Sequence, residues 1–383
     1  MSWDEERLAR AGLSHACEGG ALRLATLVAA EGSVAVWQAL RTGPADSTWA
    51  RRARGLDLDL LVQRSDRAGV RFVAPGDPQW PSQLADLEGV QVGGMGGPPV
   101  GLWLRGPGDL AGWSQKAVGV VGARSSTPYG DQVTSQLASE LSAPRPDPRV
   151  GTWGWTVVSG GAYGIDACAH RAAVARGGRT IAVLAGGVDE PYPRGNWSLF
   201  EQLAADHLLV SEVPVGMHPT RSAFLARNRL IAALSRGTVL VEAGARSGAI
   251  NTCSWAGECG RQVMAVPGPV FSATSEGCHR LVRDGRAALV TEAREVGALL
   301  EPLAQAPIPG VGGAPRLLDG VDADLLAVRE VLPGRGAMPV GEVAARAGLS
   351  IALALSSLGQ LEELGLVGCD SSGEWRISRP RPR

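Results

Sequence analysis

SGGAYGID, residues 159–166, directly follows an apolar run at residues 155–158 and precedes a helical pattern. A strand that ends in small residues and restarts as a helix directs several backbone N–H groups at one point, which suits a phosphate group. A second loop of this kind, GARSS at residues 122–126, also follows an apolar strand pattern, and the basic segment RNR lies at residues 227–229. Three anion-binding elements in one α/β region predict a polyphosphate or nucleic-acid ligand.

Strand and helix patterns alternate through the middle of the chain. Near-continuous apolar strands such as AVGVV, residues 117–121, indicate burial on both faces and therefore a mostly parallel sheet in a doubly wound α/β fold. Strands are expected at residues 117–122, 156–159, 180–184, 207–213, 238–242, 262–266 and 287–290. Helices are expected at residues 129–142, 165–176, 196–205, 222–235, 249–259 and 276–284.

Two smaller units flank this α/β domain, which we place at residues 69–302. Residues 1–68 carry leucines and valines at helical spacing with glycine breaks, which predicts a small helical module. Residues 303–316 are rich in proline and glycine and are expected to form a linker. Residues 317–380 have the order helix, helix, turn, helix, hairpin, which predicts a winged helix-turn-helix.

Composition excludes several classes of protein. The net charge is −1, so nucleic-acid binding must depend on a local basic patch. The sequence has no uninterrupted window of about 18 apolar residues, so no membrane span is expected. The acidic N-terminus lacks the apolar core of a signal peptide, and we therefore expect a cytoplasmic protein. The six cysteines form no C-x-x-C pair and are expected to be buried thiols, with no metal and no cofactor.

The loop at residues 122–126 offers a guanidinium and hydroxyl groups at the end of a strand. Arg124 and Ser125 can hold one phosphate there, although a tight turn with an exposed arginine explains the same residues equally well. Only Gly122 fits the spacing G-x-G-x-x-G, and no acidic residue follows at the ribose-binding distance. A dinucleotide ligand is therefore disfavoured.

The glycine-rich loop supports the same kind of ligand. Gly160 and Gly164 permit close approach of the backbone, and Ser159 offers a hydroxyl at the carboxyl end of its strand, where ligands bind in open α/β sheets. Asp166 and His170 lie one helical turn apart, so they can form a general-base dyad. The alternative, that Asp166 caps the helix and His170 packs nearby, agrees better with capping preferences.

The segment that contains Phe224, Arg227, Asn228 and Arg229 is a candidate contact for a single strand. Arginines would bind the backbone, and the aromatic ring would stack on a base. A solvated helix face with Phe224 in the core is the equally good alternative.

Glu242 begins a further strand–loop–helix pattern. Ser247, Gly248 and the first N–H groups of the following helix can form an anion-binding nest. Glu242 can be catalytic in N-glycosidic hydrolysis, or it can orient Arg229 or Arg124. The sequence has no Walker lysine, Ser-His-Asp order or metal triad, so phosphoryl transfer is disfavoured.

These motifs resemble the DprA/Smf family in order and spacing. The resemblance covers about residues 70–380, and the helical N-terminus is more loosely similar to the family's sterile-alpha-motif-like module. The matching segments are residues 75–81, 102–106, 122–130, 159–170, 224–235, 242–252, 265–268 and 277–281.

The resemblance implies an extended Rossmann-like domain that binds single-stranded DNA and is not an enzyme. It also implies a homodimer that protects incoming DNA during natural transformation, loads the RecA recombinase and displaces single-strand-binding protein. The residues implied in DNA binding are Arg124, Ser159, Gly160, Gly164, Phe224, Arg227, Asn228 and Arg229. Tyr163 stands where the family usually has a basic residue, so a charge is lost and a ring for stacking is gained.

A nucleotide-processing hydrolase is the alternative function. Related Rossmann-like proteins hydrolyse nucleoside monophosphates with a Pro-Gly-Gly-x-Gly-Thr loop and a nearby glutamate. Residues 242–248 (EAGARSG) lack that run of glycines. The terminal winged helix is expected to contact duplex DNA or a protein.

Overall fold

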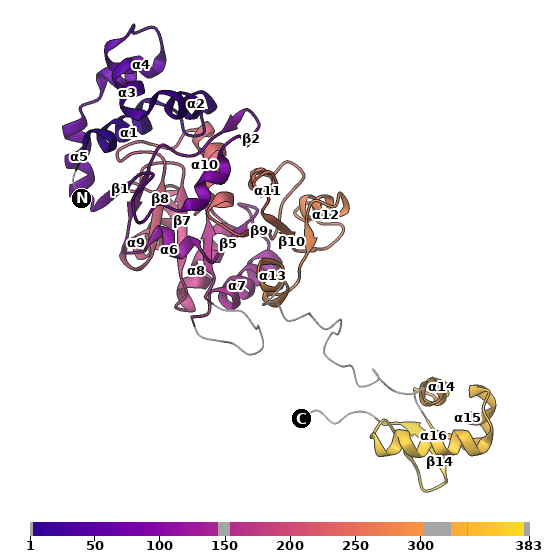
Figure 1. Ribbon diagram of the computed structural model, residues 1–383. Helices are drawn as coiled ribbons and strands as arrows, with labels where there is room; N and C mark the ends of the chain where they lie inside the picture. Colours follow the sequence, from indigo (N-terminus) through magenta and orange to yellow (C-terminus); the bar gives the residue numbers. More distant parts are fainter. Residues whose placement is uncertain (1–2, 145–153, 302–322, 335, 379–383) are drawn as a thin grey trace. The chain divides into compact units, whose positions relative to one another are not determined.

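The computed structural model divides into two compact units, Met1–Ile308 and Pro309–Arg383 (Figure 1). The residues that it describes are 3–144, 154–301, 323–334 and 336–378. The linker predicted at residues 303–316 lies outside them.

A nine-stranded sheet forms the centre of the first unit, in the order β1-β4-β8-β7-β6-β5-β9-β10-β11. All neighbours from β8 to β11 pair in parallel, whereas β4 pairs antiparallel with both β1 and β8. The strands are β1 (Val70–Val73), β4 (Leu102–Arg105), β5 (Ala117–Val121), β6 (Thr156–Ser159), β7 (Thr180–Leu184), β8 (Leu208–Ser211), β9 (Gly237–Leu240), β10 (Gln262–Ala265) and β11 (Ala288–Leu289). The predicted doubly wound, mostly parallel α/β fold is thus confirmed, and a short ribbon, β2 (Gln91–Val92) with β3 (Met95–Gly96), lies outside the sheet.

Helices cover both faces of this sheet because its central strands are apolar on both sides. Val118 of β5 packs with α7, α8 and α13 in one cluster, and Val121 of the same strand packs with α10 and α11 in another. The helices of this domain are α6 (Leu110–Ser114), α7 (Pro128–Ser142), α8 (Ile165–Ala175), α9 (Trp197–Asp206), α10 (Arg221–Ala233), α11 (Gly248–Glu258), α12 (Glu276–Arg283) and α13 (Ala293–Leu300).

The N-terminal helices belong to the same compact unit (indigo in Figure 1). They are α1 (Glu5–Ala16), α2 (Leu22–Glu31), α3 (Ser33–Thr42), α4 (Thr48–Gly55) and α5 (Leu58–Arg67). Arg7 of α1 pairs with Asp77 at 2.7 Å and donates to the Phe72 carbonyl at 2.7 Å, and the Trp103 indole N–H donates to Ser14 at 3.2 Å. These contacts attach the helical module to β1 and β4.

The second unit has its own core. Helices α14 (Ala323–Val331), α15 (Val340–Ala347) and α16 (Ile351–Glu363) pack against a three-stranded antiparallel sheet in the order β12-β14-β13. Its strands are β12 (Met338–Pro339), β13 (Val367–Cys369) and β14 (Glu374–Ile377). Gly348 ends α15 with a φ of 69°, and Ser350 caps α16 through the Leu353 N–H. The three helices and the terminal hairpin follow the predicted order, and β12 between α14 and α15 adds a third strand that was not predicted.

No single helix among the described residues is long and apolar enough to cross a membrane. The pair α15 and α16 passes the same test of length and composition together, but it is bent by 104°.

Candidate functional site

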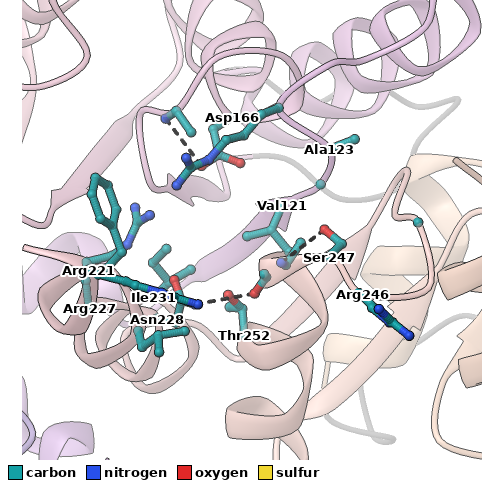
Figure 2. Close-up of a pocket in the computed structure, with 18 of the residues that line it drawn as sticks. Val121, Ala123, Asp166, Arg221, Arg227, Asn228, Ile231, Arg246, Ser247 and Thr252 are labelled. Atoms are coloured by element: carbon teal, nitrogen blue, oxygen red, sulfur yellow. Dashed lines mark hydrogen bonds between the residues drawn. The ribbon is translucent and has the colours of Figure 1, made fainter.

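The chain order of the sheet reverses between β5 and β9, because the chain runs from β5 to β8 in one direction and then returns beside β5. Ligands bind at the carboxyl ends of strands at such a point. A pocket of about 770 Å³ opens there. It is lined by the loops after β5, β6 and β9 and by the first turns of α10, so Figure 2 shows side chains from four parts of the sequence facing one cavity.

Half of the predicted site residues line this pocket. They are Gly122, Arg124, Phe224, Arg227, Asn228, Ser247 and Gly248. The other predicted residues do not line it; they are Ser125, Ser159, Gly160, Tyr163, Gly164, Arg229 and Glu242.

Arg124 and Phe224 form the mouth of the pocket. The exposed Arg124 guanidinium carbon lies 5.1 Å from the centre of the Phe224 ring, a cation–π distance. Tyr192 approaches Phe224 edge-on, with the ring centres 6.1 Å apart and the planes at 67°. The mouth therefore combines an arginine side chain with an aromatic ring. A guanidinium group can bind the phosphate of a nucleotide, and an aromatic ring can stack on its base.

Arg227 lies deeper, where it is 7% exposed and donates to the Val183 carbonyl at 2.8 Å. Burial lowers the pKa of Arg227, and the neighbouring Asp166 carboxylate opposes that shift. Burial likewise raises the pKa of Asp166, with Arg227 as the opposing charge. The Arg227 Nε–H has no hydrogen-bond partner among the described residues. A buried, incompletely paired cation thus lies at the floor of the pocket.

Asp166 and His170 do not form the general-base dyad, which was the less favoured interpretation, and His170 packs in the core as the alternative expected. The His170 Nδ1 atom lies 2.7 Å from the Thr180 hydroxyl, and Asp166 accepts a long hydrogen bond of 3.4 Å from the Ala162 N–H. Burial lowers the pKa of His170 to about 3. The imidazole is therefore a neutral core group, and Asp166 compensates Arg227.

The opposite wall is the first turn of α11. Ser247 caps this helix by accepting a hydrogen bond from the Ala249 N–H at 3.3 Å. Asn228 of α10 donates to the Gly248 carbonyl at 3.4 Å and to the Asn251 side chain at 3.1 Å. The predicted amide at position 228 therefore connects the two helices that flank the pocket.

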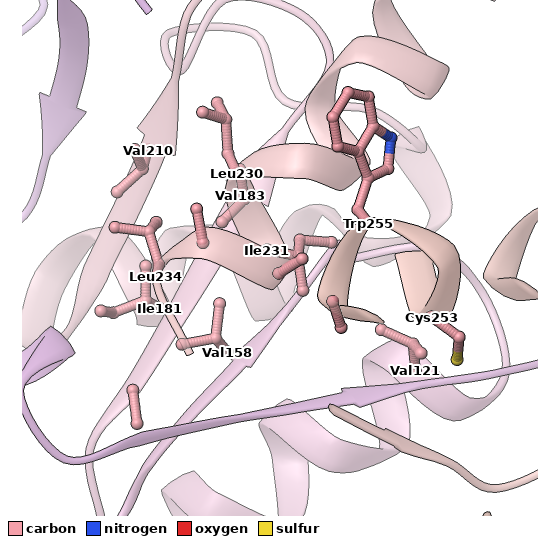
Figure 3. Close-up of a cluster of buried hydrophobic side chains, with 14 of the residues drawn as sticks. Val121, Val158, Ile181, Val183, Val210, Leu230, Ile231, Leu234, Cys253 and Trp255 are labelled. Atoms are coloured by element: carbon pink, nitrogen blue, oxygen red, sulfur yellow. The ribbon is translucent and has the colours of Figure 1, made fainter. Parts of the chain in front are cut away.

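A close-packed core holds those two helices in place. Leu230 and Ile231 of α10 and Trp255 of α11 pack on β5 to β8 through side chains such as Val121 and Val183 (Figure 3). The two helices that form the walls of the pocket are consequently held in place by well-packed apolar side chains.

Arg229 does not contribute to the pocket, contrary to the prediction. It is fully buried, its two terminal nitrogens each lie 2.7 Å from a Glu212 carboxylate oxygen, and its Nε–H donates to the Gly97 carbonyl at 3.0 Å. Arg229 therefore attaches α10 to the segment after β8.

Glu242 and Ser159 also have structural partners. The buried Glu242 carboxylate accepts from the Thr127 N–H at 2.9 Å, the Thr127 hydroxyl at 2.6 Å and the Thr274 hydroxyl at 3.1 Å. It thus orients the residue that caps α7, and neither of the two arginines considered from the sequence. Ser159 donates to the Val120 carbonyl at 2.6 Å and connects β6 to β5.

The glycines of the loop after β6 have a steric role. A Cβ atom at Gly160 would overlap the Arg227 guanidinium, and one at Gly164, where φ is 72°, would overlap the Ala123 carbonyl. Gly160 therefore makes room for Arg227 and does not itself face the cavity.

Sequence reasoning missed two arginines that line the pocket, Arg221 and Arg246. Arg221 precedes Phe224 by three residues, which places both on one face of α10, and that spacing was a readable signal. Arg246 lies in the loop before Ser247. Together with Arg124 and Arg227 they bring to four the arginines among the lining residues, against one buried carboxylate, Asp166, and the exposed Arg246 side chain points away from the cavity in Figure 2. This excess of positive charge suits an anionic polymer.

Known proteins share this chain's features over most of its length. The family model for DNA recombination-mediator protein A matches residues 71–301. The chain is 42% identical to the putative DNA processing protein DprA of Mycobacterium tuberculosis (strain ATCC 25618 / H37Rv) over 382 residues, which cover 96% of this chain and 93% of that protein.

Two solved structures are similar as well. The X-ray structure of DNA processing protein A from Streptococcus pneumoniae has a TM-score of 0.62 and 30% identity, and the match covers 79% of this chain and 100% of that one. DNA processing protein A from Helicobacter pylori, whose structure addresses a single-stranded DNA binding mode, has a TM-score of 0.50 and 26% identity, covering 60% of this chain and 95% of that one.

Proposed function

The chain belongs to the family of DNA recombination-mediator protein A, and from this membership and the pocket we propose that it binds single-stranded DNA. One observation carries the proposal. Arg124, Arg221 and Arg227 line one cavity together with the ring of Phe224, and the Arg124 guanidinium lies over that ring. The relative from Helicobacter pylori, described by its single-stranded DNA binding mode, supports the same ligand class.

The proposed mechanism needs no chemical step. The arginines neutralise phosphates and release the counterions of the strand, and the N–H groups at the start of α11 add a second phosphate contact beside Ser247. Phe224 stacks on a base, and any base can stack, so binding is independent of sequence. A duplex keeps its bases paired and stacked inside the helix, so it cannot use the ring.

The family name supports a role in recombination. We propose that the protein acts in the cytoplasm as a homodimer, protects incoming single strands during natural transformation, and loads RecA while it displaces single-strand-binding protein. The second unit, with its own core, is proposed to contact duplex DNA or a protein.

A gel-shift comparison tests the binding proposal. Single-stranded DNA is expected to bind at least tenfold more tightly than duplex of the same sequence, with a negative slope of log K against log salt of about 0.7 for each neutralised phosphate. Removal of residues 306–383 should leave this preference in place, because the pocket lies in the first unit. Equal affinity for both forms of DNA contradicts the proposal, and release of free base from nucleoside monophosphates would favour the hydrolase instead.

Gly160→Ala tests the floor of the pocket. The added Cβ would overlap the Arg227 guanidinium and displace it, so we expect the affinity for single-stranded DNA to fall about tenfold, the value of one charge-assisted contact. Gly257→Ala in α11 is the matched control, because a Cβ there meets open space. Undiminished binding by a folded Gly160→Ala variant would show that Arg227 does not touch the strand.

A further inference from the structure

A second hollow lies next to the mouth of the pocket and carries exposed aromatic rings. It measures about 360 Å³ and is lined by side chains that include Tyr192, Trp197, Arg194 and His218. Tyr192 is 52% exposed and Trp197 is 46% exposed. Large rings that remain this accessible beside a charged pocket are typical of surfaces that stack on a ligand.

The hollow adjoins the first pocket at one ring contact. Phe224 lines the pocket, Tyr192 lines the hollow, and the centres of these two rings are 6.1 Å apart. A flexible strand that leaves the pocket past Phe224 on this side meets Tyr192 next. Trp197 lines the same hollow, so it can receive a further base.

The segment that carries these rings is held firmly. Asn196 is buried in the short 3-10 helix Arg194–Asn196, and its amide donates to the carbonyls of Gly161 at 3.0 Å and Ala162 at 3.3 Å. Trp197 then begins α9. Trp197 therefore directly follows a residue that is attached to the loop after β6, and Tyr192 lies two residues before the same short helix.

Tyr163 extends the same surface. Its ring is 49% exposed, it does not line the first pocket, and a Cβ at Gly195 would contact its hydroxyl at 2.5 Å. The residue that replaces a basic group of the family thus lies against the segment with Tyr192 and Trp197.

We propose that Tyr192 and Trp197, with Tyr163 beside them, form a second base-stacking subsite for the strand that leaves the first pocket. This inference rests on the proposed binding of single-stranded DNA and extends it. Glu190 lines the hollow too and offsets the charge of Arg194, so stacking supplies the affinity here while phosphate contact supplies it in the first pocket.

The test is affinity as a function of strand length. Oligothymidylates from about 4 to about 16 nucleotides are titrated against the full chain and against Trp197→Leu, Tyr192→Leu and the double variant. The intact chain is expected to bind long strands more tightly than short ones, and each lost ring should remove at least about fivefold of that gain. Short strands should bind the intact chain and Trp197→Leu alike, because Trp197 does not line the first pocket.

Controls separate stacking from other causes. Tyr192→Phe and Trp197→Phe retain a ring and should keep the gain. Long strands that carry abasic sites beyond the nucleotides in the first pocket should bind the intact chain no more tightly than short strands do. The difference in affinity between long and short strands should change little with salt concentration. If long strands bind the double variant as tightly as the intact chain, the second subsite is refuted; if short strands fail to bind the intact chain, the proposed function fails instead.

Discussion

Arg124→Ala is expected to weaken binding of single-stranded DNA about 10- to 100-fold, the range for losing a hydrogen bond to a charged group. Arg124 is exposed at the mouth of the pocket and lies over the Phe224 ring, so the variant loses the cation that covers the ring and, with it, the proposed phosphate contact. The slope of log K against log salt should become shallower by about 0.7. Fluorescence anisotropy with a labelled oligonucleotide at several salt concentrations measures both quantities.

Two variants frame this experiment. Arg124→Lys keeps the charge but lacks the planar fork, so its affinity should fall between those of the intact chain and the alanine variant. Arg176→Ala removes an exposed arginine at the C-terminal end of α8, whereas the first turn of that helix faces the pocket through Asp166. This variant should bind single-stranded DNA with nearly unchanged affinity. Unchanged affinity of a folded Arg124→Ala variant, at every salt concentration, would remove this residue from the site.

Arg229→Met is expected to destabilise the protein by about 3–5 kcal/mol without acting on DNA directly. The substitution leaves the largely buried Glu212 carboxylate without its two hydrogen bonds from the guanidinium, and an unpaired buried charge is costly. Chemical denaturation of the first unit measures the free energy of unfolding. At a low temperature where Arg229→Met is still folded, it should bind single-stranded DNA.

The matched control is an exposed ion pair. Arg294→Met breaks the pair with Glu292, whose two side chains are about half exposed, and should cost at most about 1 kcal/mol. A double variant with Glu212→Leu added to Arg229→Met should recover part of the stability, because it removes the unpaired charge. A loss below about 1 kcal/mol for Arg229→Met would contradict the structural role assigned to this pair.

The sheet was predictable from the sequence because its strands are short apolar runs that each precede a helical pattern. The expected strand at residues 117–122 and the observed β5, Ala117–Val121, differ by one residue. The antiparallel strand β1, Val70–Val73, was missed because it pairs only with β4 at the edge of the sheet. Helix α13 was also missed, although Glu292 and Glu295 form a capping box at its start, which is a readable signal.

The site was predictable only in part. Loops that follow parallel strands must gather at one edge, so the positions of Arg124 and Ser247 followed from the order of the motifs. The difference between Arg227 and Arg229 did not follow, since both lie on one helix and only the fold brings Glu212 against the second of them. Likewise, the partner of Glu242 lies 115 residues away at Thr127, and no local pattern indicates that pairing.

The amide of Asn228 joins α10 to the start of α11 across the base of the pocket, and both helices are anchored in the core. The two walls are thus joined to each other and to one packed core. For the proposed single-stranded ligand, we therefore expect most of the conformational entropy lost on binding to come from the nucleic acid. Purine-rich strands stack on themselves and must be unstacked before they bind. We therefore expect their association rate constant to be lower than that of flexible pyrimidine-rich strands.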